Sequence, residues 1–258
     1  MKIIVTGGAG FIGSHLVDHL INQPKIKKIV ILDNLKDGSK KNLKSSVKSK
    51  KVFLYKVDIR KFKDISKFFK DVDVVVHLAA LSDIVPSIEE PIDYLETNFN
   101  GTMNILESMK QFNVKKIIYA ASSSCYGIPN KTPTSEKETI KPMYPYAFSK
   151  YIGEELIKHY SKVYKLNYIS LRLFNVYGTR SRTNSAYGAA LGVFLRQKIA
   201  NKPFTIVGDG KQKRDFVHVS DVCKAFIKAI FSKKINQILN LGYGKPSSVN
   251  KLVKLIGG

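Results

Sequence analysis

The sequence predicts an α/β fold in which helices cover both faces of a doubly wound parallel sheet. Two observations carry this prediction. The 258 residues, 44% of them hydrophobic, can bury a sizeable core as one large domain or as one domain with a smaller lobe. Short apolar runs typical of buried strands also alternate with helix-length amphipathic segments, which is the pattern of a parallel sheet covered on both faces.

The predicted elements follow one another in regular order. Buried strands favour near-continuous apolar runs, and a proline is well placed in the first turn of a helix, as Pro145 is here. The predicted strands are KIIVT (2–6), KIVILD (28–33), VFLYKVD (52–58), DVVVHLAA (73–80), KIIYAAS (116–122) and NYISLRLF (167–174). The predicted helices lie at about 12–22, 61–70, 92–112 and 145–165.

After Asn175 the alternation loosens into the loop GTRSRTNSAYG (178–188) and a helix near 189–200. This change predicts two parts, a dinucleotide-binding domain over 1–175 and a smaller substrate-binding lobe over 176–258. One late strand near 238–241 is expected to return to the main sheet. No flexible linker separates the parts, so we expect them to pack as one unit.

Composition narrows the class of protein. The net charge is +23, but lysines recur along most of the chain, and their local excess from Lys36 to Lys51 is not interleaved with aromatics, so a solvated surface is favoured over a nucleic-acid partner. No apolar run approaches the roughly 18 residues of a membrane-spanning helix, and no signal-peptide pattern opens the chain, so we expect a cytoplasmic protein without a membrane partner. Cys125 and Cys223 lack metal-type spacing, and no metal is expected.

The first chemical signal is TGGAGFIGSH (6–15), which follows a predicted strand and opens a predicted helix. In that context Gly7 permits a tight turn, Gly10 lets the backbone approach a pyrophosphate, and Gly13 lets the helix pack on the strand. The helix N-terminus offers N–H groups to the anion. A plain structural turn is the alternative, and the strand and helix around the motif favour a Rossmann-type dinucleotide site.

Acidic residues at the ends of the next two strands indicate which dinucleotide binds. Asp33 follows Gly13 by twenty positions, where a carboxylate accepts hydrogen bonds from the adenosine ribose hydroxyls. NAD is therefore expected over NADP, whose 2′-phosphate would meet like charge there, although Lys36 and Lys40 offer an alternative partner for such a phosphate. Asp58 is expected to meet the adenine, with a helix N-cap as its alternative role.

The second signal is a group of three polar side chains. Tyr146 and Lys150 are four apart on a predicted helix and so share a face, while Ser122 ends a predicted strand at the carboxyl edge of the sheet, where ligands of such folds bind. Removing a proton from a sugar hydroxyl while hydride leaves its carbon needs a base ionised near neutrality. A lysine and a cationic nicotinamide would both lower the pKa of a tyrosine toward that range.

Nine motifs in order give the chain a family resemblance: TGGAGFIGSH, LDN, VDIR, HLAA, TNFNGT, SSSCYG, YPYAFSK, LRLFNVYG and RDFVHVSDV. Over residues 2 to about 242 the sequence resembles the extended short-chain dehydrogenases/reductases, specifically the NAD-dependent epimerase/dehydratase family. The resemblance implies a nucleotide-sugar enzyme that oxidises a hexose at C4 and recycles a bound NAD. It also implies a homodimer formed by the helices at about 92–112 and 145–165.

The resemblance also implies roles for individual residues. Tyr146 would be the base, Lys150 would lower its pKa and hold the nicotinamide ribose, and Ser122 would bind the sugar O4, with Ser123 as its rival. The further cofactor residues would be Phe11, Ile12, Asn34, Ile59, Leu78, Ala79, Ala80 and Asn98, beside the glycines, Asp33 and Asp58. The nucleotide sugar would meet Ser122, Ser123, Asn175, Thr205, Val207 and Arg214, although Asn175 as a turn residue and Arg214 as a surface charge stay open.

The residues after Ser122 separate the reactions of similar enzymes. Similar 4,6-dehydratases carry Asp-Glu there and similar UDP-glucuronate decarboxylases carry Ser-Glu, whereas this chain has Ser123 and Ser124. Dehydration needs an acid for the departing C6 hydroxyl, and Ser124 cannot supply one. We therefore expect a UDP-hexose 4-epimerase acting on UDP-glucose and UDP-galactose or their N-acetyl forms. The alternatives are a dehydratase or decarboxylase of the same family and a non-catalytic NAD-binding protein.

One departure concerns the end of the chain. Similar proteins continue well beyond Gly258, with a segment that resembles part of the substrate lobe. The lobe is therefore expected to be partial, and the choice of sugar is left open.

Overall fold

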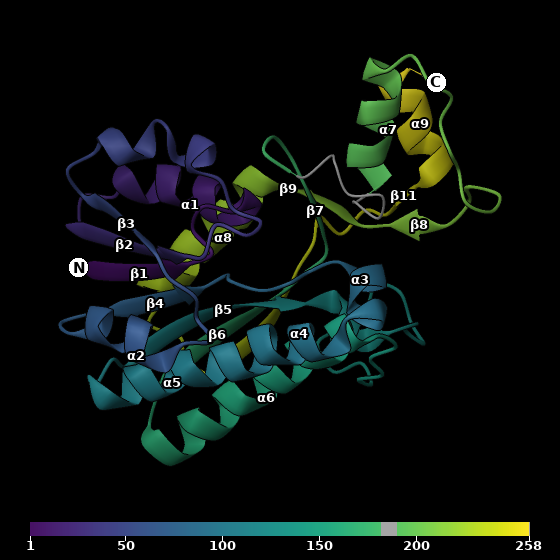
Figure 1. Ribbon diagram of the computed structural model, residues 1–258. Helices are drawn as coiled ribbons and strands as arrows, with labels where there is room; N and C mark the ends of the chain where they lie inside the picture. Colours follow the sequence, from purple (N-terminus) through teal and green to yellow (C-terminus); the bar gives the residue numbers. More distant parts are fainter. Residues whose placement is uncertain (182–189, 258) are drawn as a thin grey trace.

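The computed structural model describes residues 1–181 and 190–257, and its centre is a seven-stranded sheet (Figure 1). The strands run in the order β10-β6-β5-β4-β1-β2-β3, and every neighbouring pair is parallel. Their bounds are β1 Lys2–Thr6, β2 Lys28–Asp33, β3 Val52–Lys56, β4 Val74–His77, β5 Lys116–Ser122, β6 Asn167–Leu173 and β10 Gln237–Leu241. The predicted doubly wound fold is confirmed.

Alternation along the strands builds one core on each face of the sheet. In β1, Ile3 and Val5 belong to the core under α1 (Phe11–Ile21) and α8 (Val219–Phe231), whereas Ile4 belongs to the core on the other face. That second face is covered by α2 (Phe62–Ile65), the 3-10 turn η3 (Ser66–Phe69), α5 (Gly101–Gln111) and α6 (Pro145–Tyr164). Figure 1 shows these helices as two layers with the sheet between them.

The predicted helices are present, but two of them are composite. The segment predicted at 92–112 consists of α4 (Pro91–Leu95), the π-helical segment η4 (Glu96–Asn100) and α5. The segment at 61–70 consists of α2 and η3. Three further helices, α3 (Ile84–Glu89), α8 and α9 (Val249–Ile256), were not predicted. The signal for α8 was present, because Val219, Val222, Cys223, Phe226 and Ile230 recur at helical spacing and are all buried.

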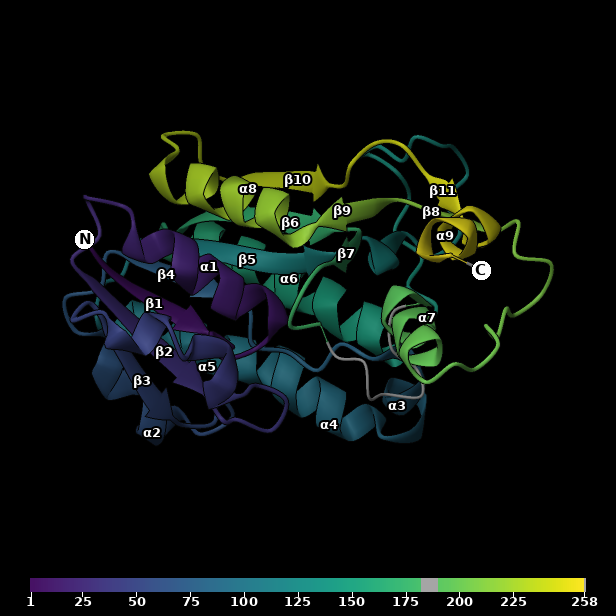
Figure 2. The same cartoon turned by 90° about the horizontal axis from the view of Figure 1, so that it is seen from above.

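The chain after residue 175 divides between the sheet and a separate group of elements. β10 pairs with β6, and α8 packs against α1, so both lie on the main sheet. The rest forms β7 (Asn175–Tyr177) with β9 (Phe216–His218), β8 (Lys213–Arg214) with β11 (Ser247–Ser248), and α7 (Ala190–Ile199) against α9 (Val249–Ile256). Figure 2 shows α7, α9, β8 and β11 beyond one end of the sheet. The boundary at 175 stays a proposal, and part of the predicted loop at 178–188 lies outside the described residues.

Candidate functional site

A cleft of about 1010 Å³ runs along the carboxyl ends of the central strands. It lies over β1 and β4, where the chain turns back after winding outward through β2 and β3. Such a reversal in strand order opens a crevice, because the loops on either side of it diverge. Residues of β5, α6 and the elements after β6 complete the lining.

The glycine turn forms one wall of this cleft, and its backbone leaves no room for side chains at Gly7 and Gly13. Gly7 has φ +68°, and a Cβ on it would lie 2.7 Å from the backbone nitrogen of Ala79. A Cβ on Gly13 would lie 2.2 Å from the carbonyl oxygen of Gly7. Gly10, the N-cap residue of α1, provides no side-chain cap, which leaves N–H groups of the first turn to an anion in the cleft.

Asp33 stands beside this turn and is 6% exposed. Its Oδ2 accepts a hydrogen bond from the Ala9 N–H at 2.9 Å, and its Oδ1 accepts one from the Leu35 N–H at 2.8 Å. Burial raises the pKa of this carboxyl, and the two backbone donors oppose that effect. A Cβ on Gly38 would lie 2.8 Å from the Asp33 carboxylate, so a close loop confines it at the edge of the cleft.

Asp58, which was expected to meet the adenine, does not itself line the cleft, whereas its neighbours Ile59 and Arg60 do, and its role toward the cofactor stays a proposal. Its carboxylate is paired with the Arg60 guanidinium at 2.8 Å and accepts a weaker hydrogen bond from the Asn34 side chain at 3.4 Å. These partners hold the pKa of Asp58 below its usual value, against the effect of burial. The alternative as a helix N-cap is also not seen, since the N-cap of α2 is Lys61.

Ser122 and Tyr146 meet at the other end of the cleft. Ser122 is the last residue of β5, and Tyr146 lies in the first turn of α6, after Pro145. Burial raises the pKa of the Tyr146 phenol, while its hydrogen bond with Ser122 lowers it. The Ser124 N–H donates to the Ser122 Oγ at 3.2 Å, and the two hydroxyl oxygens are 2.8 Å apart. Ser124 therefore fixes the position of the Ser122 hydroxyl.

Lys150 also lines the cleft, one turn after Tyr146, and is 4% exposed. Its Nζ lies 4.1 Å from the centroid of the Tyr119 ring. Burial lowers the pKa of Lys150 to about 7, and the nearby Glu154 carboxylate opposes that shift. A small change in the surroundings of Lys150 is therefore enough to change its charge near neutral pH.

The remaining predicted residues fall into two groups. Those that line the cleft are Phe11, Ile12, Asn34, Ile59, Leu78, Ala79, Ala80, Asn175, Val207 and Arg214. Asn98, Ser123 and Thr205 do not line it. Asn98 is 1% exposed, and its side chain donates to the Leu81 carbonyl and to the Ser149 hydroxyl, both at 2.9 Å. Asn98 thus joins α6 to the segment around Leu81. Thr205 is hydrogen-bonded to the Gln197 side chain.

Sequence reasoning missed a buried chain of hydrogen bonds behind the cleft. The His77 Nδ1 is 2.6 Å from the Thr6 hydroxyl, and its Nε2 is 2.9 Å from the Thr102 hydroxyl. Because the Thr102 hydroxyl donates to the Asn98 carbonyl, it accepts from the His77 Nε2–H. The Thr6 hydroxyl accepts from the Leu78 and Ala79 N–H groups and donates to Nδ1, so His77 is neutral with its proton on Nε2. Burial lowers the pKa of His77 to about 3, in agreement with this assignment. A polar residue inside the apolar run VVVHLAA was the available signal.

The cleft also contains residues that carried no recognisable motif. Asn42 anchors the loop after β2 by donating to the Ala9 carbonyl at 2.9 Å, and Arg180 reaches the rim with its guanidinium 2.7 Å from the Asp18 carboxylate. Asp83 lines the cleft near Tyr146 and contributes to raising its pKa. None of these three could be singled out, since single polar residues in loops have no periodic pattern.

Comparison with known proteins matches the chain over residues 3–242 to the family described as "NAD dependent epimerase/dehydratase family". A Methanocaldococcus jannaschii protein named "Putative UDP-glucose 4-epimerase" is 44% identical over 257 residues, which cover 98% of this chain and 81% of that protein. No helix among residues 1–181 and 190–257 is long and apolar enough to cross a membrane.

Two solved structures carry the comparison to the fold. The UDP-N-acetylglucosamine 4-epimerase of Methanobrevibacter ruminantium, in complex with UDP-N-acetylmuramic acid, is 37% identical with a TM-score of 0.93, over 98% of this chain and 80% of that one. The UDP-glucose 4-epimerase of Thermus thermophilus, in complex with NAD, is 32% identical with a TM-score of 0.89, over 99% of this chain and 82% of that one.

Proposed function

Since the chain belongs to the NAD-dependent epimerase/dehydratase family, we propose that it interconverts UDP-hexoses by inverting the configuration at C4 of the sugar. The enzyme is an isomerase and its cofactor is NAD. The observation that carries the proposal is the meeting of Ser122, Tyr146 and Lys150 in one cleft with the glycine turn.

The residues of the cleft fit NAD on structural grounds. The turn from Gly7 to Gly13 excludes side chains and directs the first turn of α1 into the cleft, as a pyrophosphate requires. Asp33 is confined at the carboxyl end of β2, where it can accept hydrogen bonds from ribose hydroxyls. Leu78, Ala79 and Ala80 offer apolar surface to the adenosine.

In the proposed reaction, Tyr146 takes the proton from the sugar O4 and later returns it, while Ser122 hydrogen-bonds that oxygen. When bound, NAD supplies the acceptor and donor for the C4 hydride. Lys150, when charged, favours the Tyr146 phenolate electrostatically and fixes the neighbouring ribose. Inversion requires that the 4-keto sugar present its other face before the hydride returns. The lowering of the Tyr146 pKa by Lys150 belongs to this proposal.

On the substrate side we assign Asn175, Arg214 and Val207 to the nucleotide. An exposed guanidinium can bind a diphosphate, and Val207, 81% exposed, offers apolar contact to a base. Thr205 keeps a weaker case, because its hydroxyl and N–H are both bonded to Gln197. Ser123, outside the cleft lining, likewise has less support than Ser122 as the partner of O4.

The test is incubation of the purified protein with UDP-glucose, UDP-galactose and their N-acetyl forms, without added NAD. We expect the two C4 epimers of at least one UDP-hexose pair to interconvert. Chromatography of the nucleotide sugars measures this conversion. A dehydratase would instead accumulate a 4-keto-6-deoxy product, and a decarboxylase would release CO₂ from UDP-glucuronate. If protein that contains bound NAD converts none of these UDP-hexoses, the proposal is contradicted.

A homodimer and a cytoplasmic location complete the proposal. The helices expected to form the dimer carry exposed apolar side chains, including Ile92, Met103 and Phe148. Gel filtration is the measurement: elution at the position of a single 29.0 kDa chain would contradict the dimer.

A further inference from the structure

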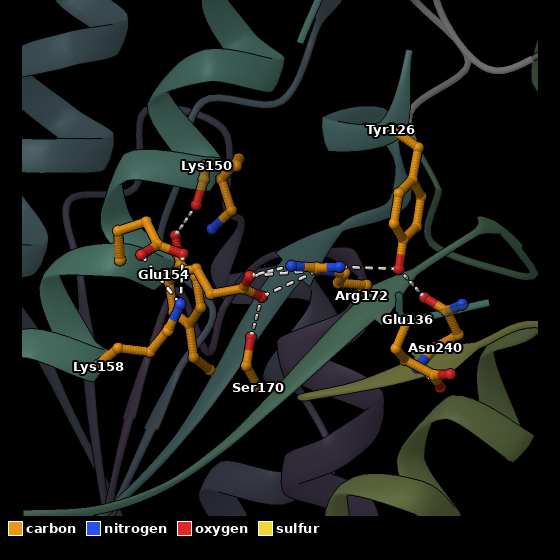
Figure 3. Close-up of polar contacts among 10 residues, drawn as sticks. Tyr126, Glu136, Lys150, Glu154, Lys158, Ser170, Arg172 and Asn240 are labelled. Atoms are coloured by element: carbon orange, nitrogen blue, oxygen red, sulfur yellow. Dashed lines mark hydrogen bonds and ion pairs between the residues drawn. The ribbon is translucent and has the colours of Figure 1, made fainter. Parts of the chain in front are cut away.

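A buried group of charged and polar side chains lies behind the cleft, between α6 and the strands β6 and β10 (Figure 3). The Arg172 guanidinium binds the Glu154 carboxylate through Nε and Nη2, at 3.2 and 2.5 Å, and also donates to the Tyr126 hydroxyl at 2.8 Å. Tyr126 in turn donates to the Asn240 side chain at 2.7 Å. The side chains of Glu154 and Arg172 are 1% and 5% exposed, and neither lines the cleft.

Glu154 stands one helical turn beyond Lys150, four residues along α6, so the two share a face of the helix. Figure 3 shows the carboxylate turned toward Arg172 on β6. Ser170 also donates to it, at 2.6 Å. These donors fix the position of the carboxylate and supply the pairing and hydrogen bonds that a group so deeply buried requires.

Lys150 needs such a charge more than an exposed lysine would. Its ammonium faces the Tyr119 ring and is removed from water. Burial pulls its pKa down to about 7, and the Glu154 carboxylate is the group that pulls it up. Because the value of about 7 already includes the effect of the carboxylate, removal of the carboxylate would lower the Lys150 pKa further.

Apart from Tyr146, whose proton transfer is the proposed chemistry, the other titratable groups around the pair hold one charge state through the assay range. Burial keeps His77 neutral, with a pKa of about 3, and raises the pKa of Cys125 to about 12. It also raises the pKa values of the surrounding phenols. These phenols are Tyr146 and Tyr151 on α6, Tyr119 on β5, Tyr168 on β6 and Tyr126 in the 3-10 turn η5 (Ser123–Tyr126). His77 lies on β4, Arg172 on β6 and Cys125 in η5.

We propose that Glu154 is a positioning residue for the reaction: its buried carboxylate, fixed by Arg172 and Ser170, keeps the Lys150 ammonium charged and directed into the cleft. The proposal rests on the proposed function. The ion pair between Glu154 and Arg172 then does more than join α6 to β6. It touches neither substrate nor cofactor and acts on the reaction only through the charge of Lys150.

The test is the pH dependence of kcat/KM for epimerisation by the NAD-loaded E154Q variant. Lys150 must be protonated to act, so a lower Lys150 pKa moves the alkaline limb of the profile to lower pH. We expect a shift of about 1 pH unit in E154Q. E154D, which retains the charge, should restore most of the limb. E155Q is the matched control, because Glu155 is the next residue of the helix, is 40% exposed and pairs with Lys158; its limb should stay with that of the wild type.

Thermal unfolding shows which variants are folded. If the arginine left unpaired in E154Q unfolds the chain, E154Q/R172M removes both buried charges, and the same downward shift is expected. An alkaline limb unchanged from the wild type in the folded variant would overturn the inference. A wild-type protein that does not epimerise would instead refute the proposed function, so the two failures are distinguishable.

Discussion

The two walls of the cleft are built in different ways. The cofactor wall consists of strand ends and backbone: Gly7 and Gly13 lie too close to their neighbours for any side chain, and Asp33 is 6% exposed. The opposite wall is formed by short elements such as the two-residue strand β8. Its residues Val207, which is 81% exposed, and Arg214 lie at the surface. Changes to the glycine turn should therefore alter folding and cofactor binding together, and changes to the reacting side chains should alter catalysis. Changes to Arg214 on the second wall should alter substrate affinity.

The largest effect is expected for Tyr146→Phe, which removes one hydroxyl from the cofactor side of the cleft. Loss of the proton acceptor should lower kcat by about 10²–10⁴-fold with little change in KM. The free energy of unfolding should change by less than about 1 kcal/mol, since only the hydrogen bond with Ser122 is lost. Steady-state kinetics and urea unfolding measure the two quantities. Activity equal to that of the wild type would remove Tyr146 from the catalytic assignment.

Gly13→Ala tests whether the cofactor wall is as rigid as its contacts indicate. The new Cβ would lie 2.2 Å from the Gly7 carbonyl oxygen and 2.7 Å from the Gly8 Cα, and backbone atoms cannot rotate away. We expect a loss of about 3 kcal/mol in the free energy of unfolding and purification without NAD. Urea unfolding and the NAD released on denaturation are the measurements. A stable variant with a full complement of NAD would show that the turn yields.

Arg214→Ala tests the exposed wall. Removal of a guanidinium that binds a diphosphate should raise the KM for the nucleotide sugar about tenfold, which corresponds to about 1.4 kcal/mol. The kcat, the NAD content and the unfolding free energy should stay near wild-type values, because the side chain is exposed. Arg214→Lys is the conservative control and should fall between the two. A loss of kcat at unchanged KM would contradict this division of labour.

Gly244→Ala gives the smallest effect and contrasts with Gly13→Ala, because Gly244 lies between β10 and β11, outside the cleft lining. Gly244 has φ +83°, but no atom lies within 4 Å of a Cβ built on it. The substitution should cost about 1 kcal/mol through backbone conformation alone and leave NAD binding and KM unchanged. The same urea unfolding measures it. A cost as large as that of Gly13→Ala would mean that the segment around Gly244 is packed as closely as the glycine turn.

Much of the fold was predictable because it depends on neighbours in the sequence. The strands KIIVT and KIVILD coincide with β1 and β2, since each run of buried aliphatic residues specifies a strand locally. The helix opening at Pro145 was predicted for the same reason. Within the site, the spacing of glycines around one turn and of Tyr146 and Lys150 on one helix also needs only local geometry.

Other features could not be predicted, because they depend on how side chains are placed in the folded chain. Asp58 fits the pattern of an adenine-binding carboxylate, yet it is absent from the cleft lining and its carboxylate pairs with Arg60, which does line the cleft. Thr205 likewise is bonded to Gln197. The single helix expected at 92–112 contains the π-helical segment η4, within which Asn98 reaches Leu81 and Ser149.

The sequence by itself determined the glycine turn, Asp33 and the group of Ser122, Tyr146 and Lys150, since each is specified by a strand end or a helical turn. Only the tertiary structure decided the surroundings that set their charges. Glu154 and Arg172 are 18 positions apart and meet through the packing of α6 on β6. The neutral state of His77 and the lowered pKa of Lys150 follow from burial, which is a property of the packed core.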